Sequence, residues 1–275
     1  RPMVLGALNT PPESASLHVL CHVLADGVWA SRNAGDFYIA KRNLSDALAA
    51  PVLRYLAQHG AKYRPNCRIA QVQAASGKVQ ADGQTFDAAV FAVAPYHLAP
   101  LLPEHLGNAV RQAVQQLSYH AITTVYLRYP QPLHLPAALT GFAHRPTQWL
   151  LDRGRLQHPN EAAAIISTSD LVAESSLHTD GKPDWAATAH QDLLQLNPHL
   201  PPPEAQQTIT EKRATVASTV NRRLPDMADL NAARIWLAGD WLHERYPATL
   251  EAAVQTGERA AQQCLAALTR TSGTC

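Results

Sequence analysis

The sequence predicts a mixed α/β fold in which the chain leaves an α/β part, forms an antiparallel sheet and then re-enters the α/β part. Residues 36–103 combine one helical pattern with short β segments, and residues 218–275 end in a buried strand followed by a capped helix. Between them, residues 104–217 carry longer, partly alternating apolar segments, which are typical of antiparallel strands. Residues 1–35 are predicted to be helical and to belong with this central sheet.

The first predicted helix begins at Thr10. Thr10 suits the N-cap, Pro11 suits the first helical position, and Glu13 lies three residues after the cap, which completes a capping box. One apolar stripe is expected along this helix, formed by Leu17, Leu20, Val23 and Leu24. A second helix is expected over residues 45–59, ended by Gly60 in the position after the C-cap.

Short strands follow the second helix. The segments AKYRP and CRIAQVQA are expected to be extended. A turn at Ser76-Gly77 then leads to the strand KVQA, and a turn at Asp82-Gly83 leads to the strand QTF. The next segment, DAAVFAVA at residues 87–94, is almost continuously apolar. That pattern predicts a strand buried on both faces of a sheet.

The central insertion has three clear strand segments, at residues 121–129, 147–153 and 162–169. Their partial alternation predicts a separate antiparallel sheet. A helix is expected over residues 184–196, after which the chain returns through QQTITEKRATVA.

The last elements form a strand, a turn and a helix. A short buried strand is expected over residues 234–238, and Gly239 follows it without a Cβ, so that backbone or ligand can approach closely. Ligands of open α/β sheets bind at the carboxyl ends of strands, where Asp240 would accept hydrogen bonds from hydroxyl groups. Thr249 is expected to cap the final helix. Its apolar stripe is predicted to consist of Leu250, Val254, Gly257 and Ala261.

Composition excludes several classes of function. The 275 residues carry a net charge of +1 without a dense basic run, so no nucleic-acid partner is indicated. The richest apolar run, residues 88–102, is too short and too interrupted to cross a bilayer. The cysteines show no metal-binding spacing, so no metal site is predicted, and reduced thiols in a cytoplasmic protein are expected. They are Cys21, Cys67, Cys264 and Cys275.

The segments LAGDW and YPATLEAAVQTGERAA resemble the C-terminal FAD-binding motif of the flavin amine oxidase and phytoene desaturase superfamily. Together with ALNTPPESAS, RIAQV, FDAAVFAVAP and EKRATVASTVNRRLP, they are most similar to the squalene-associated FAD-dependent desaturase group. The resemblance implies an FAD-binding Rossmann-like domain interleaved with an antiparallel-sheet substrate domain. Carried over by position, it assigns FAD contacts to Gly239, Asp240, Pro247, Ala248, Thr249, Leu250, Glu251 and Ile69, the last in the strand before Val72 and facing adenine.

One motif of that superfamily is missing. The sequence contains no GxG, and nothing before Asn9 can form a glycine-rich phosphate cradle. Two explanations of the missing motif remain open. The N-terminal third has been removed, which the absence of an initiating methionine favours, or the chain is a degenerate relative that no longer binds FAD. Firm binding of FAD by these 275 residues is therefore not expected.

The resemblance implies FAD redox chemistry on a long isoprenoid, namely replacement of the hydroxyl group of hydroxysqualene by hydride to give squalene in hopanoid biosynthesis. Such a substrate also implies peripheral contact with a membrane. Three alternatives remain: a carotenoid desaturase, an amine oxidase, or a flavin-free scaffold or binding module. No catalytic residue is assigned from the sequence. Residues 243–245 are expected to form a solvated charged loop, and Tyr126, Phe142 and Trp149 to be ordinary core residues rather than the lining of a substrate tunnel.

Overall fold

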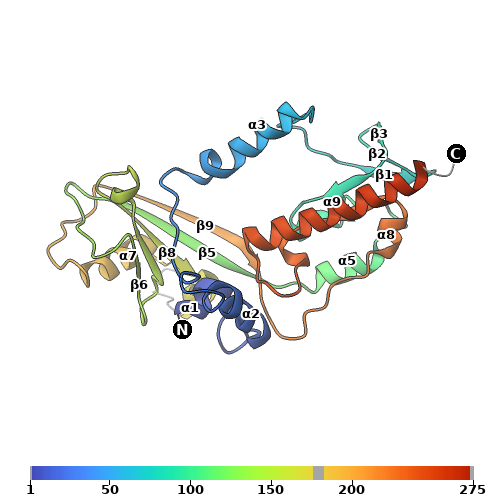
Figure 1. The fold of residues 1–275 in the computed structure, drawn as a ribbon. Helices are drawn as coiled ribbons and strands as arrows, with labels where there is room; N and C mark the ends of the chain where they lie inside the picture. The colour runs from blue at the N-terminus through green and yellow to red at the C-terminus, as the bar shows by residue number, and fades with distance from the viewer. Residues whose placement is uncertain (1, 176–182, 273–275) are drawn as a thin grey trace. The chain divides into compact units, whose positions relative to one another are not determined.

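The computed structural model describes residues 2–175 and 183–272, and Cys275 lies outside the described residues. The chain divides into two compact units (Figure 1). Unit 1 comprises residues 1–15, 24–65 and 119–215, and unit 2 comprises residues 16–23, 66–118 and 216–275. The functional roles assigned to the four sequence segments remain predictions.

Unit 1 is built on a five-stranded sheet with the order β6-β7-β8-β5-β9. The pairs β5·β8, β6·β7 and β7·β8 are antiparallel, with Val125 opposite Ala164 and Trp149 opposite Ile165, which confirms the predicted antiparallel sheet. In β5, buried side chains alternate with less buried ones over most of the strand, as expected for a sheet covered mainly on one face. The strands are β5 (Tyr119–Arg128), β6 (Leu139–Gly141), β7 (Trp149–Asp152), β8 (Glu161–Ser167) and β9 (Ala205–Val216).

The helix α7 (Trp185–Leu194) covers the core of unit 1. Asp184 caps this helix by accepting a hydrogen bond from the backbone N–H of Ala187 at 2.9 Å, so the predicted helix is confirmed. Ala189 and Leu193 are fully buried and belong to the same core cluster as Val125 of β5. Two shorter elements of this unit are the 3₁₀ helix η2 (Arg153–Leu156) and α6 (Ser169–Ser175).

The first predicted helix begins later than expected. After α1 (Pro2–Leu8) the chain turns, and α2 spans Leu17–Gly27. The hydroxyl of Thr10 donates to the carbonyl of Leu8 at 2.9 Å, so Thr10 is not the N-cap, and the side chain of Ser16 accepts from the N–H of Val19 instead. The predicted apolar stripe is also wrong, because Leu17 is exposed and Val19 is the buried position of α2.

The second predicted helix is confirmed as a π-helical turn, η1 (Ser45–Ala49), continued by α3 (Ala50–Gln58). Gly60 has a φ of +79°, which confirms its place after the C-cap.

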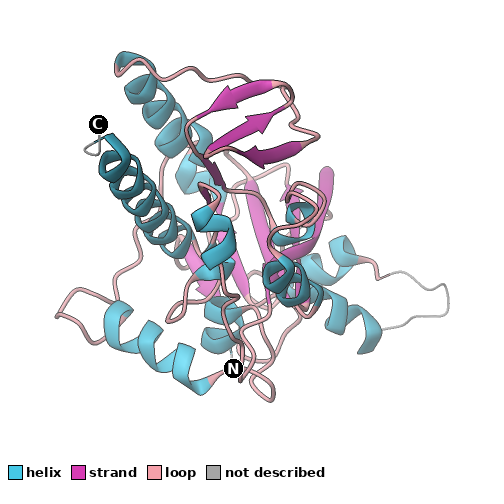
Figure 2. Ribbon diagram, turned by 90° about the vertical axis from the view of Figure 1, so that its right-hand side faces the viewer, coloured by secondary structure: helices cyan, strands magenta, loops and turns pink. Residues whose placement is uncertain are grey.

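Unit 2 contains the predicted β-meander, a three-stranded antiparallel sheet drawn as three short arrows in Figure 2. Both predicted turns are confirmed, because Ser76-Gly77 and Asp82-Gly83 all have positive φ. Residues 61–71 form no strand, contrary to expectation. The N–H groups of Ala70 and Gln71 instead donate to the carboxylate of Asp82, which replaces a strand ladder there. The strands are β1 (Val72–Ala75), β2 (Lys78–Ala81) and β3 (Gln84–Phe86).

Two parallel strands, β4 (Ala89–Phe91) and β10 (Ile235–Leu237), form the second sheet of unit 2. All three residues of β10 are buried, as predicted. The strand predicted over residues 87–94 is present as β4, but its predicted burial on both faces is wrong, because Val90 is 42% exposed. The other elements of this unit are α4 (Pro95–Leu98), α5 (Asn108–Gln115), α8 (Ala228–Ala232), η3 (Asp240–Leu242) and α9 (Leu250–Ser272).

The long helix α9 packs against β10 through a different face from the one predicted. Leu250 and Val254 of the predicted stripe are exposed, whereas Ala252, Thr256 and Ala260 are buried. Ala260 lies in one cluster with Trp236 and Ala238 of the β10 region, since small helix residues allow close approach to the strand. None of the described helices is both long and apolar enough to cross a lipid bilayer.

Candidate functional site

The turn after β10 is fixed by a hydroxyl group of α9. The N–H of Gly239 donates to the Oγ1 of Thr256 at 3.0 Å, and the carbonyl of Gly239 lies 3.0 Å from the same hydroxyl. Gly239 has a φ of +156°, and a Cβ at this position would lie 2.8 Å from the ring of Trp241. This position therefore requires glycine, both for its backbone conformation and for the close approach of the indole.

Asp240 and Arg222 are two partly buried charges beside this turn. Burial raises the pKa of Asp240, an effect that the backbone N–H of Trp241 and the charge of Arg222 oppose. Burial lowers the pKa of Arg222, and the charge of Asp240 opposes that shift. Arg222 lies in the segment EKRATVASTVNRRLP, which carries part of the family resemblance, but no role was assigned to this residue from the sequence.

Two buried donors of this site have no protein partner within the described part of the chain. One guanidinium nitrogen of Arg222, Nη2, donates to the carbonyl of His243, but its Nη1 makes no hydrogen bond there, and neither does the indole N–H of Trp241. Buried donors are normally satisfied, so these two groups are suited to an acceptor that the chain itself does not supply. A buried cation and free donors fit a phosphate-bearing ligand, and a half-buried carboxylate fits hydroxyl groups, so the residues present fit a flavin dinucleotide.

His243 is 5% exposed, so the expected solvated loop is wrong for this residue. Its Nδ1 accepts from the backbone N–H groups of Arg245 at 3.2 Å and Tyr246 at 2.9 Å. The proton of the neutral ring therefore sits on Nε2, which donates to the Oε1 of Gln255 at 2.9 Å. The ring also stacks on Tyr246 with centroids 4.7 Å apart. His243 thus anchors the loop to α9.

The start of α9 lies where the sequence predicts it. The Oγ1 of Thr249 accepts from the N–H of Ala252 at 3.2 Å, which confirms the cap, and Leu250 and Glu251 are exposed in the first turn. Pro247 and Ala248 precede the helix. The flavin contacts assigned to these residues, and to Gly239 and Asp240, remain predictions.

Ile69 does not lie in a strand, contrary to expectation. It precedes β1 in an extended segment and is partly exposed. Within the described residues, no hydrogen bond joins Ile69 to the turn at Gly239, and its contact with adenine remains a prediction.

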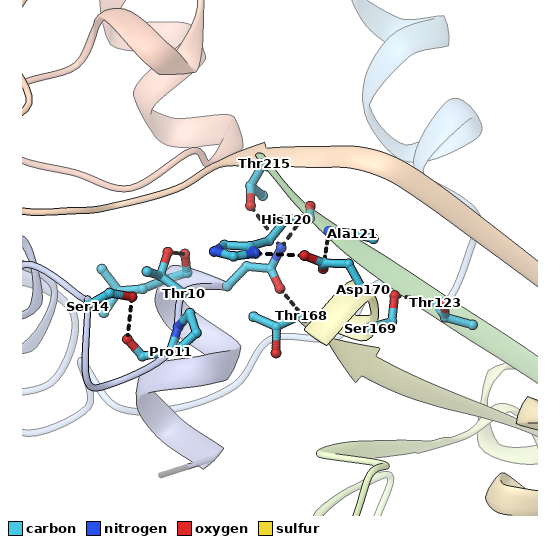
Figure 3. Close-up of polar contacts among 12 residues, drawn as sticks. Thr10, Pro11, Ser14, His120, Ala121, Thr123, Thr168, Ser169, Asp170 and Thr215 are labelled. Atoms are coloured by element: carbon cyan, nitrogen blue, oxygen red, sulfur yellow. Dashed lines mark hydrogen bonds and ion pairs between the residues drawn. The ribbon is translucent and has the colours of Figure 1, made fainter. Parts of the chain in front are cut away.

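Unit 1 contains a separate polar cluster (Figure 3). Asn9, which is 4% exposed, lies at its centre. Its side-chain amide donates to the Oγ1 of Thr215 at 2.9 Å and to the carbonyl of His120 at 3.3 Å, and its side-chain oxygen accepts from the N–H of Thr168 at 2.8 Å. One side chain from the turn after α1 therefore links β5, β9 and the segment that leads into α6.

A histidine and a carboxylate face each other in the same cluster. The Nδ1 of His120 donates to the Oδ2 of Asp170 at 3.0 Å, and the other carboxylate oxygen accepts from the N–H of Ala121 at 2.8 Å. Nearby, the hydroxyl of Thr123 is bonded to those of Ser169 and Thr210 at 2.9 and 2.8 Å. The sequence gives no signal for the pair, because fifty positions separate its members.

The three aromatic residues that were considered as the lining of a substrate tunnel lie in different environments. Phe142 packs against the main core, which fits its expected role. Trp149 is half-buried and lies against Gly6 and Gly141, and its expected core role remains a prediction. Tyr126 instead faces a cavity of about 660 Å³ and lies under the guanidinium of Arg153 at 4.9 Å. This cavity is lined mainly by polar and charged residues, which does not suit a hydrocarbon.

Comparison with known proteins places these features in a family. Residues 2–265 match the family model described as flavin containing amine oxidoreductase. Two curated proteins named hydroxysqualene dehydroxylase are similar to the chain, from Rhodopseudomonas palustris at 29% identity over 97% of the chain, and from Sinorhizobium fredii at 24% identity over 96%. The chain spans 62% and 61% of these relatives' lengths.

Solved structures share the fold at low sequence identity. Cyclohexylamine oxidase from Brevibacterium oxydans superposes with a TM-score of 0.67 at 13% identity, covering 98% of this chain and 63% of the other. A redesigned putrescine oxidase gives a TM-score of 0.67 at 17% identity, covering 96% and 63%. These likenesses confirm the predicted fold class.

Proposed function

The chain belongs to the flavin containing amine oxidoreductase family, and we propose that it is part of an FAD-dependent oxidoreductase that converts hydroxysqualene to squalene. FAD is the cofactor that this family membership supports. The observation that carries the proposed substrate is the similarity to hydroxysqualene dehydroxylases, which extends over 96–97% of the chain.

The turn at Gly239 has the groups that such a cofactor needs. The cationic guanidinium of Arg222 would bind a phosphate oxygen, and the carboxylate of Asp240 would accept hydrogen bonds from the ribityl hydroxyls. Thr256 holds the turn in place. The backbone N–H groups at the N-terminus of α9 would face a polar edge of the bound ring system. A bound reduced flavin would supply the hydride for the reaction.

The proposed substrate is a long isoprenoid, which is poorly soluble in water, so we include peripheral contact with a membrane in the proposal. Exposed aromatic side chains of unit 1 support it, including Trp29, Phe37 and Tyr38. Sedimentation with liposomes tests this part, and a protein that stays in the supernatant would contradict it.

The reaction itself is tested by product analysis. We expect the whole oxidoreductase of which this chain is proposed to be part, supplied with FAD, a chemical reductant and hydroxysqualene without oxygen, to form squalene that gas chromatography and mass spectrometry identify. Oxidation of an amine or desaturation of a carotenoid, without squalene formation, would favour the other members of the superfamily. Absence of any flavin-dependent reaction would favour a scaffold or binding module.

Replacing Arg222 by methionine is expected to weaken FAD binding about 10- to 100-fold, because a charge-assisted hydrogen bond contributes about 1.5–3 kcal/mol. The neighbouring Arg223 is exposed and offers a matched control. Arg223→Met should leave the affinity for FAD unchanged. Titration of flavin fluorescence measures both variants, and equal affinities would exclude Arg222 from the site.

Replacing Asp240 by asparagine should stabilise the flavin-free chain at neutral pH but not in acid. The folded-state pKa of Asp240 is raised above 3.8, so charging this carboxyl destabilises the folded state as pH rises from 3.8 through the folded pKa. Below 3.8 the carboxyl is largely protonated in both states, and the penalty is absent. Urea unfolding at pH 3.5 and pH 7 measures this difference, and an equal effect of the substitution at both pH values would contradict it.

A further inference from the structure

The polar cavity of about 660 Å³ lies within unit 1 and contains none of the residues assigned to the flavin. Its lining comes from strands β5 and β9, which lie side by side in Figure 1, from η2 and the turn after it, and from the start of β8. Three lining residues can carry a positive charge, Arg128, Arg153 and His158, against the single carboxylate of Glu161. The cavity is therefore suited to an anion.

The guanidinium of Arg153 is held in place by two contacts. Its Nη1 donates to the carboxylate of Glu161, and its Cζ lies 4.9 Å from the centre of the Tyr126 ring. The side chains of Arg153 and Glu161 are only 22% and 21% exposed. Nε and Nη2 make no hydrogen bond with any residue that the structure describes. Because a guanidinium has five N–H donors in one plane, this arginine is preorganised and still has donors for a ligand.

Arg128 has no anionic partner in the described part of the chain. Glu161 lies directly opposite it in the register of β5 and β8, where residues of opposite charge commonly pair. The carboxylate of Glu161 binds Arg153 instead, and the side chain of Arg128 makes no ion pair or hydrogen bond with a described residue. The same holds for the imidazole of His158. Both side chains are therefore available to a ligand in the cavity.

We propose that this cavity binds a phosphate ester of a small polyol, of the kind that a glycerophosphate presents. The phosphate oxygens would accept hydrogen bonds from the two guanidinium groups, which suit phosphate through their planar, paired donors, and from the imidazole of His158. A lone carboxylate would occupy only one of the two guanidinium groups. The amides of Gln206 and Gln207 would bind hydroxyl groups, because an amide both donates and accepts.

Two kinds of molecule carry this group, a soluble glycerol phosphate and the headgroup of an anionic glycerolipid. A lipid headgroup would add a specific contact to the proposed attachment to a membrane. The site does not depend on the hydroxysqualene reaction, so its failure would leave the proposed function standing.

Calorimetric titration of sn-glycerol 3-phosphate into the chain tests the soluble source, with glycerol as the uncharged control. Arg128→Met should weaken binding about 10- to 100-fold, the effect of losing a charge-assisted hydrogen bond. Arg128→Lys keeps the charge without the planar fork and should retain part of the affinity. Since Arg128 is exposed, both variants should keep the wild-type midpoint of urea unfolding.

Arg42→Met is the matched control, because Arg42 is an exposed arginine of unit 1 that does not line the cavity. It removes the same charge from the chain, so it measures general attraction between the protein and anions. This variant should bind glycerol 3-phosphate as tightly as the wild type does.

Sedimentation with vesicles tests the lipid source. Vesicles of phosphatidylcholine mixed with phosphatidylglycerol should carry less Arg128→Met than wild type or Arg42→Met into the pellet, and vesicles of phosphatidylcholine alone give the baseline. A specific loss in the titration alone would assign the cavity to a soluble phosphate ester, and a specific loss in sedimentation alone would assign it to a lipid headgroup. The proposal would be overturned if neither probe binds at millimolar concentration, or if Arg128→Met and Arg42→Met behave alike in both assays.

Discussion

Gly239→Ala is expected to destabilise unit 2 and to abolish measurable FAD binding. At a φ of +156° a residue with a Cβ is strained by about 1–3 kcal/mol. The added carbon would also lie 2.8 Å from the indole of Trp241, which has to move. Since Trp241 follows Asp240 directly, the displacement changes the turn that carries the carboxylate. Urea unfolding and flavin fluorescence titration measure the two effects.

Gly257→Ala is the matched control. Gly257 lies within α9, and a Cβ there would meet nothing within 4 Å. Alanine in the interior of a helix is favoured over glycine by about 1 kcal/mol, so this variant should be more stable than the wild type. The same substitution at two glycines of one motif is therefore expected to have opposite signs. A Gly239→Ala variant with wild-type stability and FAD affinity would show that neither folding nor FAD binding requires glycine at this turn.

Asn9→Ala should lower the unfolding free energy of unit 1 by about 3–5 kcal/mol. The substitution breaks three hydrogen bonds of a buried side chain. Each partner that is left unsatisfied costs about 1–3 kcal/mol. Asn9→Asp keeps an acceptor for the N–H of Thr168 but loses both donors, so an intermediate cost is expected. Chemical unfolding followed by tryptophan fluorescence measures both variants.

A second variant, Asn66→Ala, measures the cost of the positive φ alone. Asn9 has a φ of +42°, and exposed Asn66 has a φ of +60°. Asn66→Ala should therefore cost only the conformational preference of asparagine for this region, about 1 kcal/mol. If Asn9→Ala cost no more than Asn66→Ala, the side-chain hydrogen bonds of Asn9 would not be what stabilises the cluster.

Local sequence signals predicted the parts of the fold that local geometry decides. The turns at Ser76-Gly77 and Asp82-Gly83 were predicted because short hairpins need positive φ, and the cap at Thr249 because a helix start needs a side-chain acceptor. The same N-cap pattern gave a wrong prediction at Thr10. Its hydroxyl bonds back to Leu8, and the neighbouring Asn9 takes a left-handed conformation that serves the polar cluster.

The apolar face of α9 could not be identified from periodicity alone. The larger residues Leu250 and Val254 form a clear stripe, but both are exposed. Ala252 is buried instead, and Ala260 packs in one cluster with Trp236 and Ala238 of the β10 region. Hydrophobicity patterns weigh large residues most, whereas close packing of a helix on a strand favours small ones.

The chemistry-bearing residues outside the motif were missed for a different reason. Arg222 meets the carbonyl of His243 and the charge of Asp240, and His120 meets Asp170, only after the chain has folded. Their partners lie between 18 and 50 positions away, and no spacing rule connects them. By contrast, Gly239 and Asp240 could be proposed from the sequence because their motif is contiguous.

The most direct test of the account is hydrogen–deuterium exchange of the chain with and without millimolar FAD. The proposed site predicts slower exchange in peptides that contain Gly239 and Asp240 and the first turns of α9, together with the peptide that contains Arg222. The amides of β7 and β8 in unit 1 should be unaffected. Protection confined to unit 1, or no protection of the 239–256 segment at any FAD concentration, would contradict the central claim that this strand, turn and helix bind the flavin.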